Sequence, residues 1–136
     1  MGDSSTIEVM AHRESINAGD DFDAPHWHSV ELPRVGTFAD LIAHLWDIRY
    51  VPDTSRSDPD IWALRVRPHL GRSLLIAVMR AVRTEGGDDI GWEVDRNTPL
   101  SDPQFHTDGG YISVHLSSAR NRNIRAALDY ARRHDR

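Results

Sequence analysis

The stretch that decides the fold is residues 29–47, SVELPRVGTFADLIAHLWD, where the apolar pattern changes from strand spacing to helix spacing. Its first residues favour a short strand that ends at Pro33, because proline has no amide hydrogen for a continuing ladder. Thr37 can then cap a helix, and Asp40 places a carboxylate in the first turn, where the helix dipole favours it. The helix is predicted over residues 38–47, with one apolar stripe made of Phe38, Leu41, Ile42, Leu45 and Trp46.

Strand patterns lie on both sides of this helix. Most alternate apolar and polar side chains, as a half-buried strand does, whereas the run Leu74 to Met79 is apolar throughout and is typical of a strand buried on both faces. Besides the strand that ends at Pro33, strands are predicted at residues 6–12, 62–66, 74–79, 90–94 and 111–116, and a last helix capped by Ser118 carries Ile124, Leu128 and Ala131 on its buried face.

The order strand, strand, helix, four strands, helix predicts an α+β fold. We expect a mainly antiparallel sheet of about five to six strands with two helices on one face. A chain of 136 residues fits a single domain over residues 1–136. The proline-containing segments 51–60 and 97–110 are predicted to be loops.

Composition excludes several classes of chemistry. The chain has no cysteine, which removes disulfides, thiolate nucleophiles and cysteine-rich zinc sites. All 16 basic residues are arginine, so the lysine of a phosphate-binding P-loop is also missing. No apolar run is long enough to span a bilayer and the N-terminus lacks signal-peptide features, so we expect a cytoplasmic protein that does not enter membranes.

Charge is distributed unevenly along the chain. The net charge is −5, and the acidic residues are concentrated in the first 60 residues, whereas the remainder is slightly basic. An acidic N-terminal half would repel nucleic acid phosphates and could steer a basic protein partner. We interpret the arginines of the last helix as its solvated face, so no nucleic acid partner is expected.

The segment with the most chemistry is residues 18–28, AGDDFDAPHWH. His26 and His28 are two residues apart and would point the same way on an extended chain. Asp20, Asp21 or Asp23 could then complete a metal site, which would make the protein a small metal-dependent enzyme. The alternatives are surface histidines that bind no metal and a structural or incidental ion, and no second metal-ligand motif elsewhere supports the enzyme. Trp27 lies between the two histidines, where it either packs under the turn or is exposed as an interface anchor.

Other catalytic constellations are weaker. Ser113, His115 and Asp108 can be assembled into a candidate triad, but no Gly-x-Ser-x-Gly elbow accompanies them, and solvent exposure on one sheet face explains the serine and histidine. Asp88 and Asp89 follow a glycine pair and indicate a hairpin turn rather than an acid–base pair. From the residues we therefore expect no enzyme, no cofactor and no bound metal.

The chain resembles a group of small bacterial proteins in four segments. These are the run Ile16 to His26, the helix Phe38 to Asp47, the Tyr50-Val51-Pro52 turn and the strands that lead to Val78. Those proteins share a Gly-Asp-Asp turn with a following Asp-Ala-Pro-His, then an amphipathic helix and a Tyr-hydrophobe-Pro turn. The likeness covers residues 7–80. Proteins of this kind resemble the immunity proteins that pair with secreted bacterial toxins.

This resemblance implies a binding protein that neutralises a cognate toxin by occluding its active site or surface through an acidic face. Such an inhibitor needs no catalytic residue of its own, and toxin active sites are often basic, so opposite charge would speed the encounter. The expected partner-binding residues are Asp20, Asp21, Asp23 and Trp27, with Asp53, Asp58 and Asp60 in a second loop.

Overall fold

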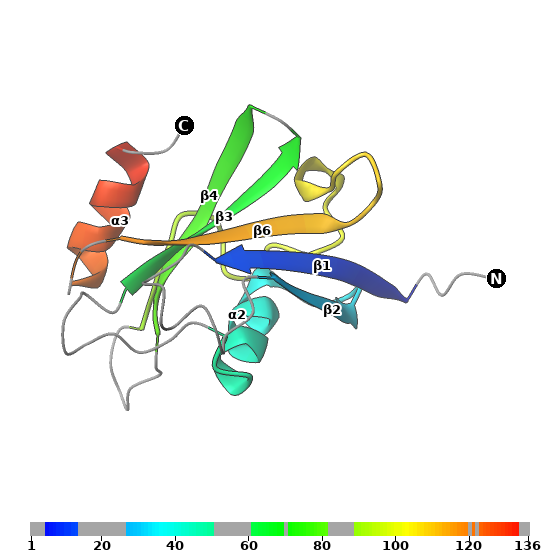
Figure 1. Ribbon diagram of the computed structural model, residues 1–136, viewed down its shortest axis with the longest axis horizontal. Helices are drawn as coiled ribbons and strands as arrows, with labels where there is room; N and C mark the ends of the chain where they lie inside the picture. The colour runs from blue at the N-terminus through cyan, green and yellow to red at the C-terminus, as the bar shows by residue number, and fades with distance from the viewer. Residues whose placement is uncertain are drawn as a thin grey trace.

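The computed structural model describes residues 5–13, 27–50, 61–69, 71–81, 89–119, 121 and 123–133. Within them the chain forms one six-stranded sheet with two α-helices (Figure 1). The strand order is β2-β1-β6-β3-β4-β5. The elements are β1 (Thr6–Arg13), β2 (Trp27–Pro33), α2 (Phe38–Asp47), β3 (Ile61–His69), β4 (Arg72–Arg80), β5 (Ile90–Trp92), the 3-10 turn η1 (Pro103–Phe105), β6 (Ile112–Ser118) and α3 (Ile124–Arg133).

The sheet is mixed but mostly antiparallel. Among the described strands, β1 and β6 form the one parallel pair, second and third in the order, and the other neighbouring strands are antiparallel. This confirms the predicted α+β class and the predicted order of strands and helices. The predicted loops differ in outcome: residues 97–110 form a loop that contains η1, whereas residues 51–60 lie outside the described residues.

Helix α2 begins as the sequence predicts. The Thr37 backbone N–H donates to the Asp40 carboxylate at 2.9 Å, and the Asp40 N–H donates to the Thr37 hydroxyl at 3.4 Å, which completes a reciprocal capping box. Two bonds then fix the helix to the sheet. The Trp46 indole donates to the carbonyl of Arg80, and the Tyr50 hydroxyl donates to the carbonyl of Ala11.

The prediction that both helices cover one face is wrong. Helix α2 packs in a core that includes Trp62, Leu64 and Val66 of β3, whereas α3 packs on Ile61 and Ala63 from the opposite face of the same strand. The physical reason is that β3 and β4 are apolar on both faces, so each face must be covered to remove it from water. Figure 1 shows the two helices on opposite sides of the sheet.

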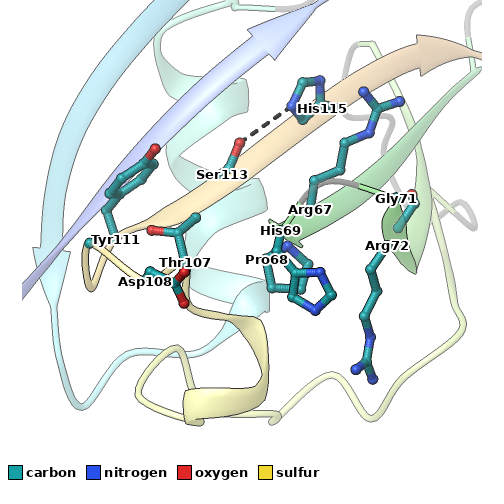
Figure 2. Close-up of a pocket in the computed structure, with 12 residues that line it drawn as sticks. Arg67, Pro68, His69, Gly71, Arg72, Thr107, Asp108, Tyr111, Ser113 and His115 are labelled. Carbon is teal, nitrogen blue, oxygen red and sulfur yellow. Dashed lines mark hydrogen bonds between the residues drawn. The ribbon is translucent and has the colours of Figure 1, made fainter.

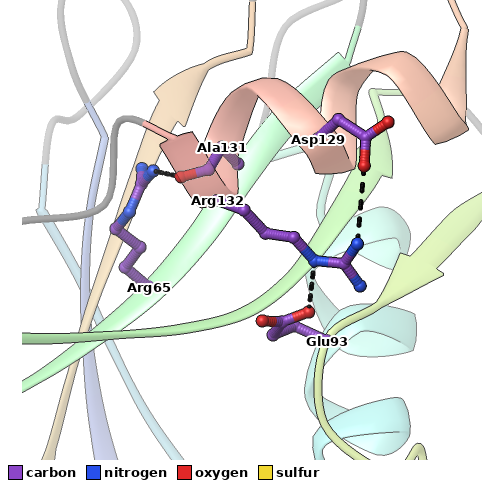
Figure 3. Close-up of polar contacts among 5 residues, drawn as sticks. All are labelled: Arg65, Glu93, Asp129, Ala131 and Arg132. Carbon is purple, nitrogen blue, oxygen red and sulfur yellow. Dashed lines mark hydrogen bonds and ion pairs between the residues drawn. The ribbon is translucent and has the colours of Figure 1, made fainter.

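Side chains at both ends of α3 hold it in place. Asn123, not the predicted Ser118, caps the helix: its side chain accepts from the Ala126 N–H at 3.0 Å, whereas Ser118 still belongs to β6. At the other end, Arg65 of β3 donates to the carbonyl of Ala131 at 3.0 Å (Figure 3). A cation there also suits the negative end of the helix dipole.

A further ion pair joins the outer surface of α3 to the segment after β5. The Arg132 guanidinium lies 2.7 Å from the Glu93 carboxylate and 3.4 Å from that of Asp129 (Figure 3). All three side chains are partly exposed to water, so the pairs add little free energy but orient the helix surface. Within the described residues, no helix is long and apolar enough to cross a membrane.

Candidate functional site

Among the described residues, helix α3 covers one end of its face of the sheet, and no other described helix packs on the remainder. We call this uncovered area the open face. The strand register places its outward side chains in rows: Trp27, His12, His115 and Arg65 form one row, and Ser29, Met10 and Ser113 form the next. Four strands, from the edge strand β2 to β3, therefore contribute to a single polar surface.

Trp27 is the most prominent side chain of the open face. The residue is 55% exposed although tryptophan is large and apolar, and its ring lies against that of His12 with centroids 4.4 Å apart. The His12 ring in turn meets that of His115 with centroids 5.3 Å apart. Of the two alternatives that the sequence left open for Trp27, the structure has the exposed one.

Two carboxylates lie on the same face of β1 and β2, four residues along each strand from His12 and Trp27. Glu8 and Glu31 are directly opposite in the register, and both are exposed. The Ser29 hydroxyl donates to the Glu8 carboxylate at 3.1 Å. Like charges directly opposite one another destabilise a strand pair. The Glu8–Glu31 pair therefore lowers the stability of the fold, and folding does not explain its presence. We call Glu8, His12, Trp27, Ser29 and Glu31 the acidic edge.

A hollow of about 660 Å³ opens at the other side of the same face (Figure 2). It lies between the β3–β4 turn and the loop that precedes β6. Its polar lining residues are Arg67, His69, Arg72, Ser73, Thr107, Asp108, Tyr111, Ser113 and His115. The two halves of the open face therefore differ in charge, with carboxylates toward β2 and arginines on β3 and β4.

His115 is the titratable group between the two halves. Burial first, and then the neighbouring charges of Arg67 and His12, together lower the pKa of its imidazole to about 4. Its Nε2 is 3.3 Å from the Ser113 hydroxyl (Figure 2). The ring is thus neutral at pH 7 and can exchange a hydrogen bond with the serine.

These contacts do not complete the candidate triad. Ser113, His115 and Asp108 do line one hollow, but Asp108 is not hydrogen-bonded to the imidazole in the described part of the chain. A triad needs that third group to orient the histidine. The pair is therefore better described as a polar contact on a sheet face, as the sequence pattern indicates.

Of the residues that the sequence offers for a metal site, the structure describes only His28. His28 points to the α2 side, where its ring stacks on that of His44 with centroids 5.8 Å apart. Burial, and then the neighbouring His44, lower the pKa of His28. No group of three or more possible metal ligands occurs among the described residues, and His26 with its neighbouring aspartates lies outside them.

Of the predicted partner-binding residues, the structure describes only Trp27. Asp20, Asp21, Asp23, Asp53, Asp58 and Asp60 lie outside the described residues. Sequence reasoning missed Glu8, Glu31 and Arg67. The alternation of residues 6–12 was a usable signal for Glu8 and His12, because it places both on the face opposite Ile7 and Val9.

Comparison with known proteins gives little further information. No protein-family model matches this sequence, and no curated protein matches it. Among solved structures, the ubiquitin-like domain of PLXNC1 is similar at a TM-score of 0.46 and 9% sequence identity, over 82% of this chain and 96% of that one. A likeness of this size carries no argument about function.

Proposed function

We propose that this chain is an immunity-type binding protein that neutralises a bacterial toxin by docking its acidic edge on a basic surface of that toxin. The observation that carries the proposal is the exposure of Trp27, at 55%, on an edge strand of an uncovered sheet face. Tryptophan is enriched among the few residues that dominate binding energy at protein interfaces. A partner would remove this exposed apolar surface from water.

Charge supports a basic partner. Glu8 and Glu31 are exposed and opposite one another, and a cationic side chain placed between them would relieve their repulsion. In sequence, Trp27 follows closely after Asp20, Asp21 and Asp23, which the proposal assigns to the same contact. Opposite charges on the two partners would raise the association rate, and salt would lower it.

Inhibition by occlusion requires no chemistry from this chain. The Ser113–His115 contact lacks an orienting acid in the described part of the chain, as a non-catalytic surface would. The described residues contain no group of three or more possible metal ligands, and they do not orient the Ser113–His115 contact with an acid. No observation on them therefore favours the metal-dependent enzyme as a second candidate. The proposed role of Asp53, Asp58 and Asp60 as a second contact remains part of the same binding model.

The test begins by purifying the tagged chain from its native cells and identifying any co-purifying chain by mass. That chain is then expressed alone and together with this protein. The proposal expects a basic chain that arrests growth alone and is harmless in the presence of this protein. A co-purifying chain without toxicity, or toxicity that this protein does not relieve, would contradict it.

Variants locate the surface. Trp27→Ala, and separately Glu31→Lys, should weaken protection and slow or destabilise the complex, measured as association and dissociation rates. The matched controls are Ile48→Ala and Asp47→Lys, which change exposed residues at the end of α2, beyond the opposite face of the sheet. Equal effects in test and control variants would exclude the acidic edge as the contact.

A further inference from the structure

Two arginines border the hollow on the basic half of the open face. Arg67 and Arg72 are exposed and border the hollow, one on β3 and the other at the start of β4. Within the described part of the chain, neither guanidinium forms an ion pair with a carboxylate. Guanidinium groups in such a position are suited to bidentate binding of phosphate or carboxylate.

Hydroxyl groups surround the same space. The Ser73 and Thr107 hydroxyl oxygens are buried and have no hydrogen-bond partner among the described residues, although most buried polar groups in proteins do. Tyr111 and Ser113 add two further hydroxyl groups to the lining (Figure 2). Because a hydroxyl can donate a hydrogen bond, those of Tyr111 and Ser113 can serve an acceptor oxygen of a ligand.

The charges that face the hollow favour an anion. Two arginines contribute to its lining against one carboxylate, that of Asp108. Arg67 extends beside His115 (Figure 2), and its charge is one cause of the lowered pKa of that imidazole. The side of the hollow next to Ser113 and His115 therefore has an excess of positive charge that no described carboxylate neutralises.

We propose that this hollow binds a small organic anion whose phosphate or carboxylate group pairs with Arg67 beside Ser113, and whose remainder extends toward Arg72 and Tyr111. A volume of about 660 Å³ is in the range of small-molecule sites rather than that of a single ion. The proposal goes beyond toxin binding, because it concerns the opposite half of the open face and a different class of ligand. Either activity can fail without the other.

The test is a titration of the whole chain with two probes, inorganic phosphate and succinate, at constant ionic strength set with sodium chloride. Ring signals of His115 and His69 are followed by nuclear magnetic resonance. We expect saturable shifts for at least one probe, and the stronger of the two identifies the preferred anionic group. Binding should also raise the pKa of His115, which faces Arg67 and Arg65 of β3 and His12 of β1, because the anion offsets those charges.

Three variants make the assignment specific. Arg67→Gln should weaken probe binding about tenfold, as expected for loss of a charge-assisted hydrogen-bonding group. Arg125→Gln, an exposed arginine of α3 remote from the hollow, is the control for total charge and should bind as the native chain does. Asp108→Asn should strengthen binding, a gain that a damaged fold cannot imitate.

Certain results would overturn the proposal. Shifts that rise linearly without saturation, or that weaken equally in Arg67→Gln and Arg125→Gln, would show only general attraction of anions to arginines. Saturable binding that Asp108→Asn leaves unchanged or weakens would place the anion elsewhere. Thermal unfolding followed by circular dichroism checks that each variant is folded before it is titrated.

Discussion

The Trp27 indole lies against the His12 imidazole across the β1–β2 pair, with ring centroids 4.4 Å apart and planes inclined by 41°. His12 thus supports an aromatic ring that is otherwise exposed, at the edge of a sheet face that α3 leaves uncovered. A side chain held in this way loses little rotamer freedom when a partner binds it. This relationship explains why Trp27 is the best-placed anchor of the proposed interface.

Trp27→Ala should therefore cost little stability, about 1 kcal/mol or less, because more than half of the residue's surface is already in water. The matched comparison is Trp62→Ala on β3, where the indole is 1% exposed and removal should cost about 3–5 kcal/mol. Urea unfolding measures both. Similar losses for the two variants would mean that Trp27 belongs to the core and is not an interface anchor.

His115 should make stability depend on pH. The folded pKa of about 4 lies below the usual value of 6.5, so between these values the unfolded chain binds a proton that the folded chain does not. The contribution of the neutral imidazole is therefore fully present above pH 6.5 and is lost as pH falls toward 4. Because the ring is only half-buried, we expect a loss of about 1–2 kcal/mol after allowance for solvent screening.

The measurement compares urea unfolding of the native chain and of His115→Gln across this pH range. The native chain should lose more stability on acidification than the variant does, since the other titrating groups are common to both.

Arg67→Gln should raise the pKa of His115, observed directly from its ring signals, because one of the charges that lower it is removed. Parallel pH profiles for the native chain and His115→Gln would disprove the assignment.

The capping box of α2 gives a third prediction. Thr37→Ala removes the hydroxyl that accepts from the Asp40 N–H and should cost about 1 kcal/mol. Asp40→Asn keeps an oxygen that can accept from the Thr37 N–H and loses only its charge near the helix N-terminus, so its cost should be smaller, about 0.3–1 kcal/mol. Chemical denaturation measures both. The reverse order would mean that dipole attraction outweighs the cap bond.

Gly91 gives a test of the way α3 packs on β5. A Cβ at this position would lie 2.9 Å from a methyl of Ile124 and 3.1 Å from one of Val78, so Gly91→Ala should push α3 outward and cost about 1–3 kcal/mol. Hydrogen exchange of the α3 amides should speed up. Gly71→Ala is the contrast: its backbone has φ +82 but open space around it, so it should lose stability without exposing α3.

The helix over residues 38–47 and the order of strands and helices could be predicted from the sequence. A cap, a proline stop and a repeat of apolar residues act within a few positions, so they can be read locally. The same local alternation indicates that Glu8 and His12 share a face. It does not say what lies beside them, because the pairing partners belong to other strands, and β6 follows β1 by about a hundred residues.

By itself, then, the sequence determined the α+β class, the cap at Thr37 and the exclusion of cysteine and lysine chemistry. Only the tertiary structure decided that the helices cover opposite faces, that β1 runs parallel to β6, and that Arg67 meets Ser113 and His115 at one hollow. The physical reason is that β3 and β4 are apolar on both faces, so one helix must cover each face. That division leaves the far part of one face open, and which side chains meet there is set by strand register across the whole chain.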